Sequence, residues 1–301
     1  MKIHYIASTF LTSIWKKGHV TGIVICSPST AEFKRYMLLS SEPGYRKERI
    51  PKSRKLIIES CEYALKKHRM LGLFEADVTD ARKKIKMYEA EKGESISFTG
   101  WIAACVGLAA SEHDQVCTLK IGKHFVTFDD VNINILIETV LEGRTYPVNY
   151  ILEAANTKTV LEITQEIRQA QKMKETDYSE AKENRLLKLL LSAPKFLRDL
   201  LFWRKLRKDP VFINENMGTI AVTSIGRFAK SGGWAIPLGM HALNIAVGGI
   251  AVKPGFVGDQ IEKREFLSIT VTFDHDVVDG APATRFVSRL TELLEEGHGL
   301  P

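Results

Sequence analysis

Residues 266–281 read FLSITVTFDHDVVDGA, and this stretch decides the fold. Its first eight residues are rich in β-branched and aromatic types, which predicts a strand. His275 follows the strand, Gly280 is typical of a tight turn, and residues 282–296 have the composition of a helix. The stretch therefore predicts a strand, a turn that presents a histidine, and a helix.

The residue types in this turn indicate acid–base chemistry. A histidine at a strand end can face a cavity, and its ordinary pKa lies near neutrality, where a general base works best. Asp279 lies four residues after His275, so the turn can bring its carboxylate back to orient a nearby group. Gly280 suits a backbone position that a side chain would obstruct. A lone histidine is more often a capping or surface residue, but the combination of His, Asp and Gly favours a catalytic one.

Length and charge bound the class of protein. The 301 residues are 45% hydrophobic and 26% charged, which is enough for a full core in one large domain or two small ones. The net charge of +6 favours acidic partners, including phosphate-bearing cofactors, nucleic acid and anionic membranes. The sequence has no zinc-finger spacing and no arginine-rich tail, so we expect no nucleic-acid partner and no metal.

Targeting and redox signals are weak. No run reaches the 18 or so apolar residues of a membrane span, and residues 1–30 make a poor signal peptide. The four cysteines form no C-x-x-C pair, so we expect small buried thiols in a reducing compartment. The sequence predicts a soluble cytoplasmic protein.

Two regions are expected along the chain. Residues 1–45 form an N-terminal extension, either packed on the body or poorly ordered, and residues 46–301 form the main domain. Periodicity predicts further elements in that domain. These are helices at 53–68, from Asp80 to Glu91, at 98–110 (capped by Ser97) and at 159–173, and strands at 116–121, 124–127, 131–139, 219–224 and 243–250. Strands that follow one another without helices near the C-terminus favour an α/β fold with a mixed or antiparallel sheet.

A basic helical insert is expected at about 174–212. Residues 185–208 alternate leucine and aromatic residues with eight Lys or Arg, and a break is expected at Pro194. The stretch fits an ordinary helix packed on its own domain, which we favour. It also fits a membrane-surface or partner-binding helix, or a lid with basic residues near phosphates.

The histidine motif resembles the H-x-x-x-D-G signature of the coenzyme A-dependent acyltransferases with the chloramphenicol acetyltransferase fold. It is most similar to the catalytic domain of the 2-oxo acid dehydrogenase acyltransferases, the dihydrolipoamide acyltransferase family. Four other segments resemble that family in the same order: 74–79, the helix from Thr159 that follows Pro147-Val148, 218–226 and 243–250. The resemblance covers about residues 50–301 and implies a two-layer α/β fold with a mixed sheet.

The resemblance implies roles for particular residues. His275 would act as general base, removing a proton from a thiol that attacks a thioester. Thr223 would donate a hydrogen bond to the oxyanion, with Ser224 as the neighbouring alternative. Asp279 would anchor the turn through an ion pair with Arg54. Coenzyme A or its acyl thioester would be a substrate, with no covalently bound lipoyl group.

The resemblance also implies an assembly. The family places its active sites between the subunits of a trimer, so we expect a homotrimer or a multiple of trimers. This chain departs from the family at Asp276, where an arginine is usual, and such a charge raises the pKa of a neighbouring histidine or repels acidic substrates. His241 is expected to be structural. A lipoyl segment is missing before residue 50, which predicts a stand-alone catalytic domain with an acceptor that the sequence leaves open.

The sequence thus predicts acyl transfer by a coenzyme A-dependent acyltransferase. Two alternatives stay open at this point. One is an oligomeric scaffold without catalysis that retains the fold. The other is a membrane-associated acyltransferase acting on a lipid-linked acceptor through residues 185–208.

Overall fold

The computed structural model describes residues 11–13, 24–26, 46–141, 144–172, 193–226 and 231–301. The chain divides into two units, Met1–Ile50 and Pro51–Pro301. In the first unit, β1 (Leu11–Ser13) pairs antiparallel with β2 (Val24–Cys26).

A six-stranded sheet of order β3-β10-β9-β8-β6-β7 organises the second unit. The pairs β3/β10, β10/β9 and β6/β7 are antiparallel, whereas β8 is parallel to both β9 and β6. The strands are β3 (Arg69–Asp77), β6 (Ile133–Leu141), β7 (Arg144–Leu152), β8 (Ile220–Ser224), β9 (Leu243–Val257) and β10 (Gln260–Asp274). The sheet is therefore mixed, and the predicted α/β fold class is confirmed.

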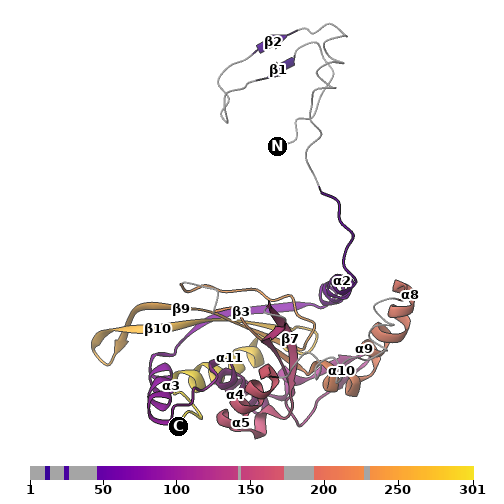
Figure 1. Cartoon of the computed structure of the whole chain (residues 1–301). Coiled ribbons are helices and arrows are strands. Elements are labelled where there is room, and N and C mark those ends of the chain that lie inside the picture. The colour runs from indigo at the N-terminus through magenta and orange to yellow at the C-terminus, as the bar shows by residue number, and fades with distance from the viewer. Residues whose placement is uncertain (1–10, 14–23, 27–45, 142–143, 173–192, 227–230) are drawn as a thin grey trace. The chain divides into compact units, whose positions relative to one another are not determined.

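Helices form the second layer, against one face of this sheet (Figure 1). They are α3 (Thr79–Lys92), α4 (Phe98–Ser111), α5 (Val160–Lys172) and α11 (Gly280–Glu295). The Ser97 side chain accepts a hydrogen bond from the Gly100 amide at 3.1 Å, so the predicted cap of α4 is confirmed. The short elements η1 (Asp114–Cys117), β4 (Leu119–Ile121), β5 (His124–Val126) and η2 (Ala155–Thr157) connect these layers.

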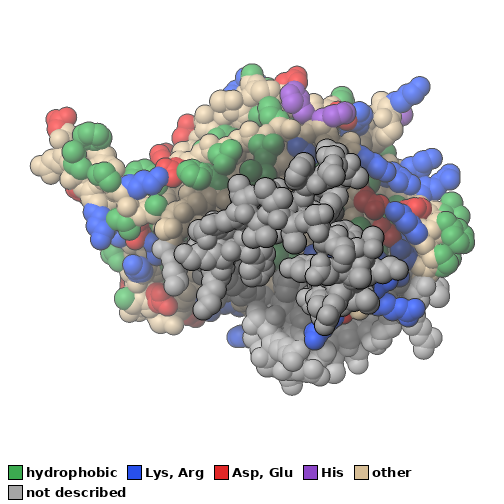
Figure 2. Space-filling model, turned by 90° about the horizontal axis from the view of Figure 1, so that it is seen from above, with side chains coloured by type: hydrophobic (Ala, Val, Ile, Leu, Met, Phe, Trp, Pro, Cys, Tyr) green, Lys and Arg blue, Asp and Glu red, His purple; other side chains and the backbone are tan. Residues whose placement is uncertain are grey.

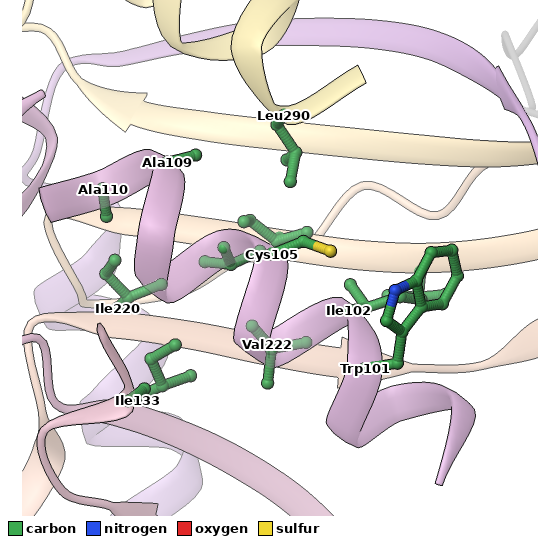
Figure 3. Close-up of a cluster of buried hydrophobic side chains, with 14 of the residues drawn as sticks. Trp101, Ile102, Cys105, Ala109, Ala110, Ile133, Ile220, Val222 and Leu290 are labelled. Atoms are coloured by element: carbon green, nitrogen blue, oxygen red, sulfur yellow. The ribbon is translucent and has the colours of Figure 1, made fainter. Parts of the chain in front are cut away.

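The core lies between α4, α11 and the sheet (Figure 3). Helix α4 is apolar on most faces, and Gly107 lets it approach η2 closely, because an added Cβ would lie 2.9 Å from the Ala155 backbone. The side chains that meet in Figure 3 include Trp101, Ile102 and Cys105 from α4, Ile133, Ile220 and Val222 from the strands, and Leu290 from α11. All are buried, so α4 is the central helix of the domain.

A long hairpin formed by β9 and β10 extends beyond the neighbouring strands. Strand β8 pairs with β9 up to Val247, and β3 pairs with β10 from Phe266 onwards. The hairpin turns at Gly258, whose φ of 60° suits glycine. Phe256 and Ile261 pair across it and are 78% and 67% exposed. Figure 2 shows hydrophobic and charged side chains together on this projection, at the left.

The described part of the basic insert is a helix packed on its own domain. It consists of α8 (Lys195–Arg198), the π-helical segment η3 (Asp199–Trp203) and α9 (Arg204–Lys208), and α10 (Pro210–Met217) follows it. Trp203 and Leu206 are buried in a second apolar cluster with Ile213. The helix begins directly after Pro194, as the sequence predicts. The rest of the expected insert, residues 174–192, lies outside the described residues.

A buried ion pair joins this insert to α2 (Lys52–Ala64). The Glu59 carboxylate accepts hydrogen bonds from the Arg198 Nε at 3.2 Å and from the Trp203 Nε1 at 2.9 Å. The Glu59 and Arg198 side chains are only 7% and 6% exposed. The hydrogen bond from Arg198 lowers the pKa of Glu59, so the carboxylate stays ionised. A neighbouring pair, Glu62 with Lys195 at 2.8 Å, is half exposed.

We expect Glu59→Ala to lower the free energy of unfolding by about 3–5 kcal/mol, because it leaves the Arg198 guanidinium buried without its counter-charge. Glu62→Ala is the matched control, since it breaks an exposed pair between the same two helices and should cost no more than about 1 kcal/mol. Urea denaturation of both variants measures the difference. Equal, small losses would contradict the assignment of this contact as the anchor of the insert.

Other expectations can be compared directly. The strand predicted at 266–273 is the second half of β10, and the helix predicted at 282–296 is α11. The helix predicted at 53–68 ends at Ala64, and residues 65–68 form the turn that leads into β3. None of the helices in the described part of the chain has the length and apolarity that crossing a lipid bilayer requires.

Candidate active site

His275 lies in the turn between β10 and α11, as predicted. Its amide donates a hydrogen bond to the His68 carbonyl at 2.8 Å, which ties the turn to the end of the segment before β3. The amides of Val277 and Val278 both donate to the Asp274 carbonyl at 3.0 Å. The His275 side chain is 49% exposed, so the turn presents the imidazole at the surface of the single chain.

A buried ion pair supports the residue just before His275. Lys67 Nζ lies 2.7 Å from Asp274 Oδ2, and the two side chains are 19% and 4% exposed. Burial lowers the pKa of Lys67, and the attraction of Asp274 opposes that shift. This pair could not be predicted from the sequence, because Lys67 lies 207 positions away at the end of a helical pattern.

The unusual Asp276 contacts two basic side chains, His68 and Lys120. Its carboxylate oxygens lie 2.7 Å from His68 Nδ1 and 2.8 Å from Lys120 Nζ. The hydrogen bond from Lys120, followed by that from His68, lowers the pKa of Asp276 to about 2. The negative charge that replaces the usual arginine is thus balanced within the chain by Lys120.

This pKa predicts a pH-dependent contribution to stability. Because the folded-state pKa of Asp276 is below its usual value of 3.8, ionised Asp276 stabilises the fold at pH above about 4, and this contribution is lost as the pH falls towards 2. We expect Asp276→Asn to lower the urea midpoint at pH 7 and to have a smaller effect at pH 3. Asp259→Asn, at the exposed hairpin turn, is the control. A difference between Asp276→Asn and wild type that is constant with pH would contradict the assignment.

Asp279 is at the surface of the single chain. Its Oδ1 lies 3.8 Å from His275 Nδ1, and its side chain is 87% exposed. Among the described residues it forms no ion pair with Arg54. Arg54 lies ten residues before the end of α2 at Ala64, which is about 15 Å along a helix. One chain therefore does not bring the expected partners together, and their pairing stays a prediction.

Gly280 is the first residue of α11. A Cβ built on it would meet no atom within 4 Å in the single chain. The expectation that a side chain would be obstructed here is therefore wrong within one chain. The turn is shaped instead by the hydrogen bonds that converge on the Asp274 carbonyl.

Thr223 and Ser224 lie at the end of β8. Side chains alternate along a strand, so these two hydroxyls project from opposite faces of the sheet. Ser224 shares the face of the buried Ile220 and Val222, and Thr223 takes the other face. Both residues are partly exposed and line the same cavity where the strand ends.

The sheet register separates Thr223 from His275. Thr223 pairs with Ala246 on β9, and Ala246 pairs with Thr270 on β10, five residues before His275. Two strand spacings and five residues correspond to about 19 Å between the Cα atoms. The two groups cannot act on one reacting atom within a single chain.

The cavity beside Thr223 has a volume of about 1220 Å³. It lies on the helix side of the sheet, between α3, the segment before α4, α5 and the strands β6, β8, β9 and β10. Its described lining contains Thr223 and Ser224 but not His275. The sequence did not reveal this cavity, because its walls come from segments spread over nearly 190 positions, from Arg82 to Leu267.

Other candidate groups are inert. Burial lowers the pKa of His241 to about 4, so its imidazole is neutral, and its Nε2 lies 3.0 Å from the Met217 carbonyl. This environment agrees with the structural role expected for His241. Burial raises the pKa of Cys105 and Cys117 to about 12. In the described part of the chain, no group of three or more His, Cys, Asp or Glu side chains is placed to hold a metal ion.

Comparisons with known proteins indicate the same family as the sequence motifs. The family described as 2-oxoacid dehydrogenases acyltransferase (catalytic domain) matches residues 213–300. The chain is 23% identical over 228 residues to the dihydrolipoyllysine-residue succinyltransferase component of the mitochondrial 2-oxoglutarate dehydrogenase complex of Saccharomyces cerevisiae. That alignment covers 74% of this chain and 41% of the yeast protein, so the chain spans less than half the length of that relative.

Two solved structures have the same fold. A probable dihydrolipoamide acetyltransferase from Listeria monocytogenes gives a TM-score of 0.62 at 19% identity, covering 85% of this chain and 96% of that chain. The dihydrolipoamide acetyltransferase of Azotobacter vinelandii gives 0.61 at 13% identity, covering 90% and 96%. The fold is thus that of a dihydrolipoamide acyltransferase core. With the match of residues 213–300, the resemblance to the catalytic domain of the 2-oxo acid dehydrogenase acyltransferases is confirmed.

Proposed function

We propose that the protein is a coenzyme A-dependent acyltransferase whose active sites form between subunits. The observation that carries the proposal is that the candidate base and the candidate oxyanion donor lie far apart in one chain. His275 is presented at one surface of the chain, and Thr223 lies about 19 Å away beside the large cavity. A second copy that places its His275 near this Thr223 would complete the site.

Residue spacing supports this assignment. The enzyme from Azotobacter vinelandii was investigated for the catalytic roles of a serine, a histidine and an asparagine, the histidine 52 residues after the serine and four before the asparagine. In this chain, the same two separations connect Thr223, His275 and Asp279. This chain therefore has a hydroxyl residue and a histidine at the same separation as that enzyme, and Asp279 lies where that enzyme has an asparagine.

The reaction follows from ordinary acid–base chemistry. His275 takes the proton of an acceptor thiol, and the thiolate attacks the carbonyl carbon of the acyl thioester. The carbonyl oxygen becomes an oxyanion, which the Thr223 hydroxyl stabilises by donating a hydrogen bond. The tetrahedral intermediate then expels the coenzyme A thiolate, which receives the proton from His275. A thiol pKa of about 8.5 against a histidine pKa of about 6.5 makes the first transfer only modestly unfavourable.

We infer that the assembly is a homotrimer or a multiple of trimers, because a cyclic arrangement gives every hydroxyl a partner histidine and a protein of this fold forms the cubic core of a pyruvate dehydrogenase complex. The relatives act on dihydrolipoyl groups, as their names state, so dihydrolipoamide is the first acceptor to test. The basic residues of the described insert, from Lys195 to Lys208, do not enter this proposal.

An acyl-transfer assay tests the proposal. The purified protein is incubated with acyl-CoA and dihydrolipoamide, or with other thiols, amines and alcohols, and the release of free coenzyme A is measured. We expect acceptor-dependent release and a light-scattering mass of three chains or a multiple of three. Background release with every acceptor would favour a scaffold without catalysis, and a monomer that is fully active would contradict the shared site.

A further inference from the structure

We propose that the cavity beside Thr223 is an acyl-binding pocket for an extended apolar chain, larger than an acetyl or succinyl group. This inference rests on the proposed acyl transfer and names its substrate class. The first observation is size. The cavity measures about 1220 Å³, beyond the roughly 300–1,000 Å³ that is common for pockets holding a whole drug-sized ligand. An acetyl group would leave nearly all of it unfilled.

The second observation is the chemistry of the walls. Half of the described lining residues are aliphatic or aromatic, and they come from both layers of the fold. The walls include Ile85 on α3, Ile167 on α5, Ile135 and Ile137 on β6, Ile250 on β9 and Leu267 on β10. Several of these belong to the main core, so the floor of the cavity continues the apolar interior. Such walls favour methylene groups over charge.

The third observation concerns the basic residues near the cavity. Arg82 Nη1 lies 2.8 Å from the Glu265 carboxylate, and Arg168 donates a hydrogen bond to the Ser95 carbonyl. Lys86 is exposed at the rim. Because the two arginines already have acceptors within the protein, neither of these described lining residues is free to pair with the second carboxylate of a dicarboxylic acyl group.

The position of the cavity links it to the reaction. It opens where β8 ends and is bordered there by Thr223 and Ser224, of which Ser224 has its side chain on the helix side of the sheet. A thioester bound at this end of β8 can therefore extend its acyl chain along β6 and β10 into the apolar space. The thiol end would remain outside, on the side from which a partner's turn approaches.

Calorimetric binding to the full-length protein, without acceptor, tests this inference. The ligands are acetyl-, succinyl-, butyryl- and octanoyl-CoA, used below the concentrations at which the longest forms micelles. Each added methylene that enters the cavity should tighten binding about fourfold, so octanoyl-CoA should bind at least a hundredfold tighter than acetyl-CoA. Equal affinities, or tightest binding of succinyl-CoA, would overturn the proposal.

Two cavity variants and one control locate the effect. Ile250→Trp and Ile225→Trp fill the cavity from its edge, and either should reduce the octanoyl-to-acetyl affinity ratio to less than about tenfold while acetyl-CoA binding stays within about twofold. Ile261→Trp places the same side chain on the exposed hairpin and should keep the wild-type ratio. Should one cavity variant fail to fold, the other decides. A wild-type ratio in the folded cavity variants would overturn the proposal.

The outcomes distinguish this inference from the proposed function. Absence of binding by any acyl-CoA counts against acyl transfer itself. Binding without dependence on chain length leaves acyl transfer standing and removes only the apolar pocket. Dependence on chain length that persists in His275→Ala supports the pocket even where turnover is lost, because His275 is not among the residues that line the cavity.

Discussion

Replacing His275 by alanine is expected to lower kcat by about 10²–10⁴-fold, because the acceptor thiol loses the base that ionises it as it attacks. The KM for acyl-CoA should change little, since the imidazole lies outside the cavity beside Thr223. Steady-state release of coenzyme A with increasing acyl-CoA and thiol measures both constants. A variant with wild-type turnover would remove His275 from the mechanism.

The control for this experiment is His124→Ala. His124 is an exposed histidine in β5 and belongs to neither the turn nor the cavity lining. It should retain wild-type kinetics. Circular dichroism of both variants verifies that they are folded, and this is expected for His275→Ala because the backbone contacts of the turn do not use the imidazole.

Thr223→Ala is expected to lower kcat by about 10²–10³-fold, which is the usual effect of removing one oxyanion donor. Ser224→Ala removes the adjacent hydroxyl, which projects from the other face of the sheet, and should have a much smaller effect. The reverse ranking of the two variants would transfer the donor role to Ser224. The same coenzyme A release assay measures both.

Mixing the two inactive chains provides the strongest test of a shared site. On the proposed assembly, co-expressed His275→Ala and Thr223→Ala chains would form mixed trimers in which some interfaces combine an intact His275 with an intact Thr223. With random assembly of equal amounts, about a quarter of the interfaces are intact, so about a quarter of wild-type activity should return. If each chain instead supplied both groups, the mixture would stay as inactive as its components.

The sequence predicted the elements whose side chains alternate or repeat with a clear period. The strand at 266–273, the strand at 219–224 and the capped helix at 98–110 all correspond to β10, β8 and α4. In β10 the apolar Leu267, Ile269, Val271 and Phe273 alternate with Ser and Thr, and α4 is a long apolar run behind its Ser97 cap.

Elements without such a period were missed. Most of strand β3 was not predicted, because its sequence RMLGLFEAD includes a glycine and its exposed residues are leucines. The outer half of the β9–β10 hairpin was missed as well, since its residues from Lys253 to Arg264 mix charges, Pro and Gly on both faces. Its register is imposed by the inner half, where both strands are buried.

The candidate site was likewise predictable from the sequence only in part. His275 and Thr223 could be found from local sequence, because each stands in a short motif at a strand end. The contacts that hold the turn could not be found: Lys67 reaches Asp274, and Lys120 reaches Asp276, over 207 and 156 positions. The cavity is a property of six or more elements packed together, and no local pattern encodes it.

The separation of His275 from the cavity has a consequence for how the thioester is protected. An acyl-CoA is an energy-rich compound, and a base held permanently beside it could activate water and waste it by hydrolysis. On the proposed arrangement, an isolated chain carries a base without a thioester site and a thioester site without a base. Chemistry then begins only on assembly, so dilution below the trimer dissociation constant should silence the enzyme without unfolding it.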